Sequence, residues 1–543
     1  MRVLFIWDSA EYLRFFDPVL EECVARGHDV AIAYNKTNVK KQGGLLGLRA
    51  FEGRVRVLGL VPRSNGIWRR IAYGLRGTMD FVRYFHPRFA AASAARARMK
   101  RKALPVAFGW MDRIRRLPPA AVSALEHCLA AVETSVPVCQ PIVDFLGREA
   151  PDVILVSPLV DCSSEQVDII KAARACGVRT AVCVASWDNL TNKGLIRIEP
   201  DLVIVWNDAQ KREAQEYHYV PADKIATTGA QLFDKWFDRQ PMHDRAAFCA
   251  RVGLPDTGPF LLFTGSSGFI SESRSEVAFV LRWIAALRSS QDPMLRSINV
   301  LVRPHPYNCH AWDPDPLAGT PGAVCFPRRN YNPMDEVSHA DFFDSIHHSL
   351  AVVGINTSAM IEAAIIGRPV FSMRANEFTG TQEGLVHFHY LVADNGGCVR
   401  VASTMDEHVR QLSECLRDPA AAHSETQRFI SYFVRPHGVD RPATPIFVDT
   451  VERFATAPAP APQLTPISTY LLRPVLFAGA FVAMVGALLH RPHPVRWLLR
   501  SGRKRTRRTA RRVGRTARLT VHRGAKQAKQ WREVVLRPLR ARR

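Results

Sequence analysis

The sequence predicts an α/β protein with two doubly wound parallel sheets that face a common cleft. Three patterns support this fold class. Arg2–Trp7 and Asp29–Tyr34 are apolar, strand-like runs on either side of an amphipathic helix, which makes a βαβ opening. A second α/β alternation begins at Pro259, and residues 350–371 follow the order strand, polar turn, helix, strand.

The first half supplies three candidate acids at strand ends. Ligands of doubly wound sheets bind outside the carboxyl ends of the strands. Asp8, Asp161 and Asp188 each follow an expected strand, so we expect their carboxylates to face the cleft. No Gly-x-Gly-x-x-Gly follows the first strand, so a dinucleotide fingerprint is not predicted. Further strands are expected at 152–157, 178–185, 201–205 and 224–228, and helices at 12–26, 163–176 and 208–218.

The second half repeats the alternation. We place the first α/β domain at 1–240, the second at 241–456, and a linker and tail at 457–543, with a helical insertion at 63–119. Strands of the second half are expected at 260–264, 298–303 and 350–353, and helices at 274–288, 341–349, 358–366, 405–418 and 421–433.

A phosphate site is predicted at the start of the helix that follows residues 350–353. Asn356, Thr357 and Ser358 are N-cap residue types, and backbone N–H groups at a helix start attract anions. Glu362 lies one helical turn after Ser358, where its carboxylate can accept hydrogen bonds from a ribose diol. The alternative is an ordinary capped helix in an ordinary αβ unit.

Two more polar segments end strands in the second half. Gly265, Ser266 and Ser267 begin a flexible loop rich in N–H and hydroxyl donors. Arg303 and His305, the latter between two prolines, present a cation and an imidazole that suit a diphosphate. A structural histidine has the same pattern, so both interpretations of His305 stay open.

The net charge of +23 is concentrated in two segments. Residues 490–543 hold 20 Lys and Arg against Glu533 alone, and residues 63–116 hold 14 against Asp80 and Asp112, so the rest carries a net −8. In 63–119 the basic residues alternate with aromatic ones. This composition fits an interfacial membrane helix, a helical insertion with buried aromatics, or a groove for single-stranded nucleic acid. We favour the membrane and expect nucleic acid least.

The last part of the chain has the composition of a membrane anchor. Residues 457–466 are a Pro/Ala linker, and residues 475–489 are uncharged and apolar. Such a helix covers about 22 Å, less than the roughly 30 Å of a bilayer core. We expect an in-plane or re-entrant anchor, with a tilted span as the alternative, and an Arg-rich tail along anionic headgroups.

The cysteines and the amino terminus indicate a cytoplasmic protein. The 11 cysteines are scattered, without a CxxC pair, which argues against a disulfide framework and a zinc site. Met1 leads directly into a strand, and we expect no signal peptide. The expected location is therefore the cytoplasmic face of the plasma membrane, as a peripheral or monotopic protein.

The motifs resemble those of glycosyltransferase-B-fold enzymes, which have two Rossmann-like domains. In particular, they resemble the CDP-glycerol glycerophosphotransferase family, which builds teichoic-acid-like surface polymers. The similarity covers about residues 150–375. It rests on Arg303-Pro-His-Pro306, on Asn356 to Val370 with its Gly-x-Pro-Val ending, on Trp187-Asp-Asn-Leu-Thr-Asn-Lys-Gly194, and on Lys224 to Gly229.

One departure from that family changes the expected catalytic base. Members carry a histidine after the tryptophan, where this sequence has Asp188. The resemblance therefore implies Asp188 as the base, with Asp8 and Asp161 as alternatives, although a turn-capping aspartate has the same pattern. Gly229-Ala-Gln-Leu replaces the family's Gly-x-Pro-Arg, which leaves glycerophosphate and a sugar equally possible as the transferred group.

The resemblance also implies the remaining roles. Trp187, Asn189 and Lys193 are expected beside the acceptor. Arg303, His305 and the turn at 356–358 are expected to stabilise charge on the leaving phosphate, without a metal or cofactor.

The expected function is a membrane-associated transferase in cell-envelope biosynthesis. It would use a nucleotide-diphosphate-activated donor, a lipid-linked or glycan acceptor and an anionic membrane surface, but not nucleic acid. Two alternatives remain: a sugar-nucleotide 2-epimerase on the same fold, and a non-catalytic nucleotide- or nucleic-acid-binding protein.

Overall fold

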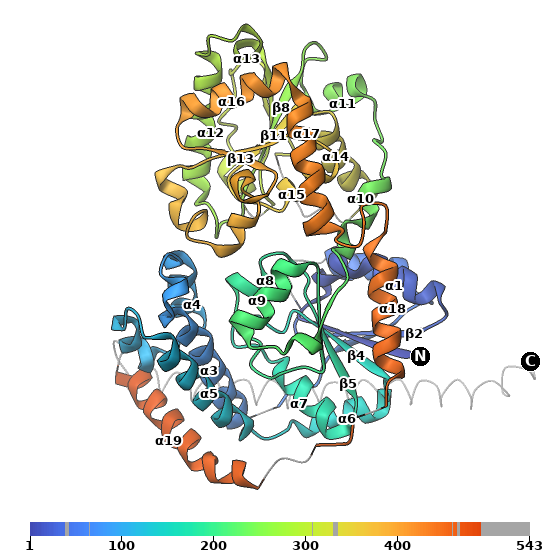
Figure 1. The fold of residues 1–543 in the computed structure, drawn as a ribbon, viewed down its shortest axis with the longest axis vertical. Coiled ribbons are helices and arrows are strands. Elements are labelled where there is room, and N and C mark those ends of the chain that lie inside the picture. Colours follow the sequence, from blue (N-terminus) through green and yellow to red (C-terminus); the bar gives the residue numbers. More distant parts are fainter. Residues whose placement is uncertain are drawn as a thin grey trace, which may run out of the picture. The chain divides into compact units, whose positions relative to one another are not determined.

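The computed structural model describes residues 1–37, 43–64, 66–306, 308–328, 335–458, 460–463 and 467–489. The Arg-rich tail expected at 490–543 lies outside these residues. The chain forms two compact units. Among the described residues, the larger comprises those of Met1–Pro105 and Gly109–Ala478, and the smaller comprises Val106–Phe108 and residues 479–489. The larger unit contains two parallel sheets (Figure 1).

The first sheet has seven strands in the order β3-β2-β1-β4-β5-β6-β7. The direction of winding reverses between β1 and β4, which pair directly, with Trp7 beside Ser157. Most strands are apolar throughout because helices cover both faces. Their bounds are β1 Arg2–Trp7, β2 Asp29–Tyr34, β3 Arg56–Leu60, β4 Val153–Ser157, β5 Arg179–Cys183, β6 Leu202–Val205 and β7 Ile225–Thr227.

The second sheet has six strands in the order β10-β9-β8-β11-β12-β13. It reverses between β8 and β11, where Gly354 pairs with Thr264. This is the doubly wound architecture that the sequence predicts for both halves. The bounds are β8 Phe260–Thr264, β9 Asn299–Arg303, β10 Ala323–Cys325, β11 Ala351–Gly354, β12 Val370–Met373 and β13 Val399–Ala402.

The helices follow the expected alternation. Those up to the second sheet are α1 Leu13–Ala25, α2 Gly43–Gly47, α3 Ile67–Val82, α4 Ser93–Lys102, α5 Pro119–Thr134, α6 Gln140–Glu149, α7 Val167–Cys176, α8 Asn189–Asn192, α9 Asp208–His218, α10 Asp234–Asp238 and α11 Arg245–Val252. Those that follow are α12 Ser273–Arg288, α13 Pro293–Ser297, α14 Glu336–His347, α15 Ala359–Ile365, α16 Met405–Arg417, α17 Pro419–Phe429, α18 Ala443–Thr456 and α19 Ser468–Leu489.

The expected insertion at 63–119 contains α3 and α4, and α3 packs on α4 and on α5, which follows the insertion (Figure 1). Its aromatic side chains Phe81, Tyr84, Phe85 and Phe89 are buried. Arg76 on α3 is also buried, paired with Glu133 and Asp168. The structure therefore favours a helical insertion with an aromatic core over the interfacial membrane helix that we preferred for this segment, since most of these side chains face inward.

Helix α18 returns to the first sheet. Phe447 lies 6.4 Å from Phe16 of α1 between ring centroids, and Arg26 of α1 binds Asp449 and Glu452 at 2.6 and 3.0 Å. Although α18 falls within the expected second domain, its apolar face completes the core of the first.

Helix α19 covers the expected apolar segment but begins earlier, at Ser468. Arg473, which interrupts the apolar run, turns toward the protein: its guanidinium lies over Trp68 and Tyr470, and it donates to the carbonyl oxygen of Ser135. In the described part of the chain, no helix combines the length and the apolar character needed to cross a membrane.

Acid should destabilise this fold through buried imidazoles such as His408. Trp283 of α12 donates its indole N–H to His408 Nε2 at 3.1 Å, and burial lowers the pKa of His408 to about 4. The unfolded chain binds a proton at this imidazole below about pH 6.5, whereas the folded chain does so only near pH 4. Stability is therefore lost as pH falls from 6.5 to 4.

We expect His408→Gln to remove about 2 kcal/mol of the stability loss between pH 7 and pH 5, measured by urea unfolding at both values. Glutamine still accepts the Trp283 hydrogen bond but does not titrate. Equal pH dependence in the variant and the wild type would contradict this explanation. The buried His218 and His387, whose pKa values are also lowered, contribute to the slope that remains.

Candidate functional site

Two carboxylates follow the strands between which the first sheet reverses. Asp8 and Asp161 share the ammonium group of Lys36, whose Nζ lies 2.6 Å from Asp8 Oδ2 and 3.2 Å from Asp161 Oδ2. Burial, together with the charge of Asp161, raises the pKa of Asp8. Burial also acts to raise the pKa of Asp161, but Lys193 and Lys36 outweigh it and lower that pKa. The structure thus brings these acids together, and their role as a base stays a prediction.

Asp188 follows β5 and is half-buried. Burial would raise its pKa, but nearby positive charge, foremost the Lys193 ammonium group, outweighs burial and lowers the pKa to about 2. The side-chain amides of Asn189 and Asn192 donate to its two oxygens at 3.3 and 3.4 Å. Asp188 is therefore an ionised carboxylate at neutral pH, beyond the carboxyl end of β5.

The residues predicted for the acceptor side surround Asp188. Lys193 lies near the Tyr12 hydroxyl, Asp188 and Asp161; burial disfavours its charge, but these partners outweigh burial and raise its pKa. Trp187 is buried directly before Asp188. Their contact with a substrate stays a prediction.

Asp80 of the insertion holds this loop in place. Its buried carboxylate pairs with the Arg197 guanidinium and accepts the backbone N–H groups of Ser163 and Leu195 at 2.8 and 2.9 Å. A Cβ at Gly194 would lie 2.4 Å from Asp80 Oδ1, so glycine alone fits there.

A second residue of the insertion, the buried Arg83, binds the same loop at residues 190–194. It donates to the carbonyl oxygens of Leu190, Lys193 and Gly194 at 3.0 to 3.1 Å. The insertion therefore shapes the segment that carries Asp188, which the sequence did not indicate.

The predicted donor residues also lie together, where the second sheet reverses. The backbone N of Asn356 lies 3.4 Å from Ser266 Oγ. A Cβ at Gly265 would lie 2.6 Å from the backbone N of His305, so the loops after β8 and β9 approach as closely as glycine allows. Ser266 donates its N–H to the buried carboxylate of Glu276 at 2.7 Å, and burial raises the pKa of Glu276 to about 8.

The turn before α15 differs in part from its expected form. Ser358 precedes the helix, but its side chain makes no capping hydrogen bond, and α15 has seven residues. Thr357 Oγ1 is 3.5 Å from the backbone N of Ala359. Burial raises the pKa of Glu362 to about 7, against the charge of Arg14. The phosphate role of this turn, like that of the half-buried Ser267, and the ribose role of Glu362 stay predictions.

Arg303 is directed away from the expected diphosphate. It is buried, and its Nη1 donates to the carbonyl oxygen of Asp341 at 2.9 Å and to Ser345 Oγ at 2.8 Å. Its guanidinium also lies 5.4 Å from the ring of Phe342. These contacts connect β9 to α14, which is a structural role for Arg303.

Residues 381–390 form a segment that contacts the turn at 356–358, which we call the donor turn after its predicted role. Gln382 Nε2 donates to the carbonyl oxygen of Ile355 at 3.0 Å, and Asn356 Nδ2 donates to that of Thr381 at 2.8 Å. The segment continues through a 3-10 turn, Val386–Tyr390, toward the loop that carries Asp188.

His387 in that turn is the candidate that the sequence reasoning missed. Its Nδ1 lies 3.1 Å from Thr191 Oγ1, and its ring meets Trp187 edge-on at 4.7 Å between centroids. The Thr191 hydroxyl also faces the carbonyl oxygen of Asp188 at 3.4 Å, an arrangement in which Nδ1 donates and Nε2 keeps a lone pair.

The imidazole of His387 is neutral at pH 7. Burial lowers its pKa to about 4, while Asp188 opposes the shift. His387 does not follow a strand directly, so the strand-end rule did not point to it. The segment joins an ionised carboxylate of one half to a neutral imidazole of the other.

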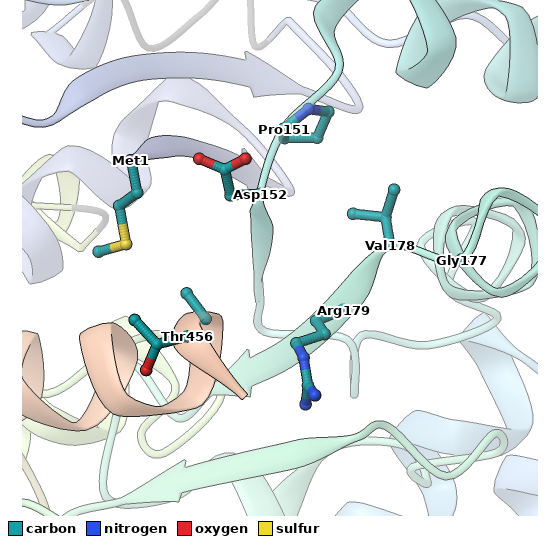
Figure 2. A pocket seen from close by; sticks show the side chains of 8 residues that line it. Met1, Pro151, Asp152, Gly177, Val178, Arg179 and Thr456 are labelled. Carbon is teal, nitrogen blue, oxygen red and sulfur yellow. The ribbon is translucent and has the colours of Figure 1, made fainter. Parts of the chain in front are cut away.

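Two other features bear on where ligands bind. In the described part of the chain, no group of three or more His, Cys, Asp or Glu side chains is arranged to hold a metal ion. Figure 2 shows a hollow of about 390 Å³ beside Met1, Asp152 and Arg179, at the amino ends of β1, β4 and β5. Arg179 there donates to the carbonyl oxygen of Pro458 in the linker. This hollow lies at the sheet edge opposite the residues above.

Comparison with known proteins identifies the fold. No protein-family model and no curated protein matches the sequence. Among solved structures, a UDP-GlcNAc 2-epimerase from Neisseria meningitidis, bound to UDP-GlcNAc, matches with TM-score 0.50 and 12% identity over 83% of this chain and 100% of that chain. A glycosyltransferase from Rickettsia africae matches with TM-score 0.48 and 9% identity over 84% and 99%. The protein has a glycosyltransferase-B-like fold.

The contacts of Asp80 with Arg197, Ser163 and Leu195, here called the Asp80 clamp, lead to a prediction about stability. Asp80→Ala leaves the buried Arg197 guanidinium and two backbone N–H groups without their acceptor. We expect a loss of about 3–5 kcal/mol in the free energy of unfolding, measured with urea. Asp112→Ala is the control on the same insertion, because its carboxylate pairs with Lys100 at the surface and should matter by less than about 1 kcal/mol. Similar losses in both variants would contradict the clamp.

Proposed function

We propose that the protein transfers a glycosyl or glycerophosphate group from a nucleotide-diphosphate donor to a hydroxyl group of an acceptor. The observation that carries the proposal is the contact of His387 with Thr191 and Trp187, which flank Asp188 in one loop, so that the charges of Asp188 and His387 act on each other. An imidazole backed by a carboxylate is suited to accept the proton of an attacking hydroxyl group. Because the same segment supports the donor turn, the base and the donor site come together.

In the proposed reaction, the acceptor oxygen bonds to the transferred group as the bond to the nucleotide phosphate breaks. The hydroxyl proton passes to His387 Nε2, and Asp188 stabilises the imidazolium. The leaving phosphate receives hydrogen bonds from the loop at Gly265–Ser267 and the turn at 356–358. The pKa values of about 2 and 4 make both groups weak bases without ligand, but the negative charge of a bound donor raises them.

The donor class has two sources of support. The solved neighbour from Neisseria meningitidis binds UDP-GlcNAc, which supports a nucleotide sugar. The motifs at 187–194 and 303–306 support CDP-glycerol through the family they resemble. A sugar-nucleotide 2-epimerase is the alternative enzyme, and it differs by converting the donor without an acceptor.

Turnover should depend on Asp188. Purified protein with UDP-, GDP- and CDP-activated sugars or CDP-glycerol should release nucleotide only when a hydroxyl acceptor is present. Asp188→Asn should lower turnover roughly 10²-fold or more, with donor affinity by calorimetry unchanged within a few-fold. Asp223→Asn, an exposed carboxylate of the same half, is the control. Turnover of Asp188→Asn close to wild type would contradict the role of Asp188 in stabilising the His387 imidazolium, and conversion of a nucleotide sugar to its epimer without acceptor establishes the alternative.

We also propose that α19 places the enzyme on an anionic membrane, where a lipid-linked acceptor would lie. With Arg473 turned inward, the helix exposes Leu471 by 78%, Val475 by 57% and Val482 by 58%. The residues that follow α19, at 490–543, carry a net charge of +19. Apolar burial and cation attraction together give firm association, with roughly 1 kcal/mol for each engaged Lys or Arg.

Salt separates the two contributions to membrane binding. At about 0.5 M salt most surface attraction is screened, so the apolar face should carry the remaining co-sedimentation with anionic vesicles. We expect substitution of Leu471, Val475 and Val482 by Ser to reduce it about tenfold, and truncation after residue 466 to abolish it. Met294→Ser with Val337→Ser, both exposed elsewhere, is the control. Removal of the protein from vesicles by RNA at equal charge would favour the nucleic-acid alternative instead.

A further inference from the structure

Arg98 on α4 of the insertion reaches the donor side of the molecule. Its guanidinium lies 4.4 Å from the centre of the Phe269 ring, in the loop that follows β8. Its Nη1 also lies 3.5 Å from the side-chain oxygen of Asn192 in the loop that carries Asp188. One side chain of the insertion therefore stands between the loops that carry the two halves of the site.

Arg98 differs from two other arginines of the insertion, Arg76 and Arg96, whose charges are paired with carboxylates. Arg76 is neutralised by two buried carboxylates, and Arg96 lies 3.5 Å from Asp112. Within the described part of the chain, Arg98 forms no ion pair with a carboxylate. Its Nε is buried and has no hydrogen-bond partner there.

The surroundings of Arg98 favour an anionic ligand. Phe269 positions the guanidinium group by a cation–π contact, which uses none of its N–H donors. The charge of Arg98 acts on Asp188, Lys193 and His387, so it belongs to the same electrostatic site. Lys193 is already balanced by Asp188 and Asp161, whereas Arg98 keeps a donor without a partner among the described residues.

We propose that Arg98 binds phosphate oxygens of the substrate through its planar N–H edge. A guanidinium group matches two phosphate oxygens in a bidentate arrangement, which an ammonium group does not. The phosphate belongs either to the donor diphosphate or to a phosphate on the acceptor. The inference deepens the proposed function, because the insertion then contributes directly to substrate binding.

Calorimetry on the full chain tests the subsite, with UDP, CDP, inorganic pyrophosphate and the unphosphorylated nucleosides as probes. We expect Arg98→Gln to weaken binding of the diphosphates and of pyrophosphate about 10- to 100-fold, with nucleoside binding unchanged. Arg98→Lys keeps the charge but not the bidentate edge and should recover only part. Arg101→Gln, an exposed arginine on the same helix, is the control. Thermal unfolding shows that each variant is folded.

The outcomes separate the subsite from the proposed function. A loss for both UDP and pyrophosphate in Arg98→Gln supports the donor diphosphate as the ligand. A loss for pyrophosphate alone supports a phosphate on the acceptor. If the wild type binds pyrophosphate through Arg98 but turns over no donor, the subsite stands and the proposed function fails. Equal binding by wild type and Arg98→Gln, or no binding of either diphosphate or pyrophosphate by the wild type, overturns the subsite.

Discussion

The candidate site depends on one buried ion pair, Asp80 with Arg197. Burial raises the pKa of Asp80, and the guanidinium of Arg197 and two backbone N–H groups oppose that shift. Such pairs add little net stability, since desolvation offsets most of the attraction. They do favour one arrangement, because any other leaves a charge buried without a partner. The close approach of Gly194 to Asp80 makes this arrangement specific to the loop that carries Asp188.

Burial affects the charges of Asp188 and His387 differently. Asp188 remains ionised because nearby positive charge, foremost that of Lys193, outweighs its desolvation, whereas His387 becomes neutral because burial prevails. An ionised carboxylate and a neutral imidazole are the starting states that the proposed proton transfer needs. They come from different halves of the chain. The hydrogen bonds of Gln382 and Asn356 tie the position of His387 to the donor turn.

Strand ends were predictable, whereas contacts between distant segments were not. The apolar runs at Arg2–Trp7 and Phe260–Thr264 fixed both sheets, and the carboxyl-end rule brought Asp8 and Asp161 together correctly. Strand β3 was missed because it is a half-exposed edge strand that lacks a continuous apolar run. Strand β10, at three residues, is too short to show a pattern.

Two of the candidate site residues were mispredicted for a different reason. His387 lies in a 3-10 turn, and its importance comes from a contact with Thr191, far away in the sequence. Arg303 was predicted from a true strand end, yet its side chain turns to α14. Periodicity locates the end of an element, but the direction of a long side chain is decided by the partners that tertiary packing offers.

A count of charged residues also does not show which side chains reach the surface. This affects the choice between nucleic acid and a membrane as the partner. The sequence of the insertion suggested a basic surface, but Arg76 and Arg83 are buried and bonded within the protein. Base stacking in a single-strand groove requires exposed aromatic rings beside the cations. Four rings of the insertion are instead buried, and Trp68 packs against Phe477. The argument for a single-strand groove at 63–119 is therefore weakened, while the basic tail at 490–543 lies outside the described residues. The outward apolar residues of α19 fit the proposed membrane surface.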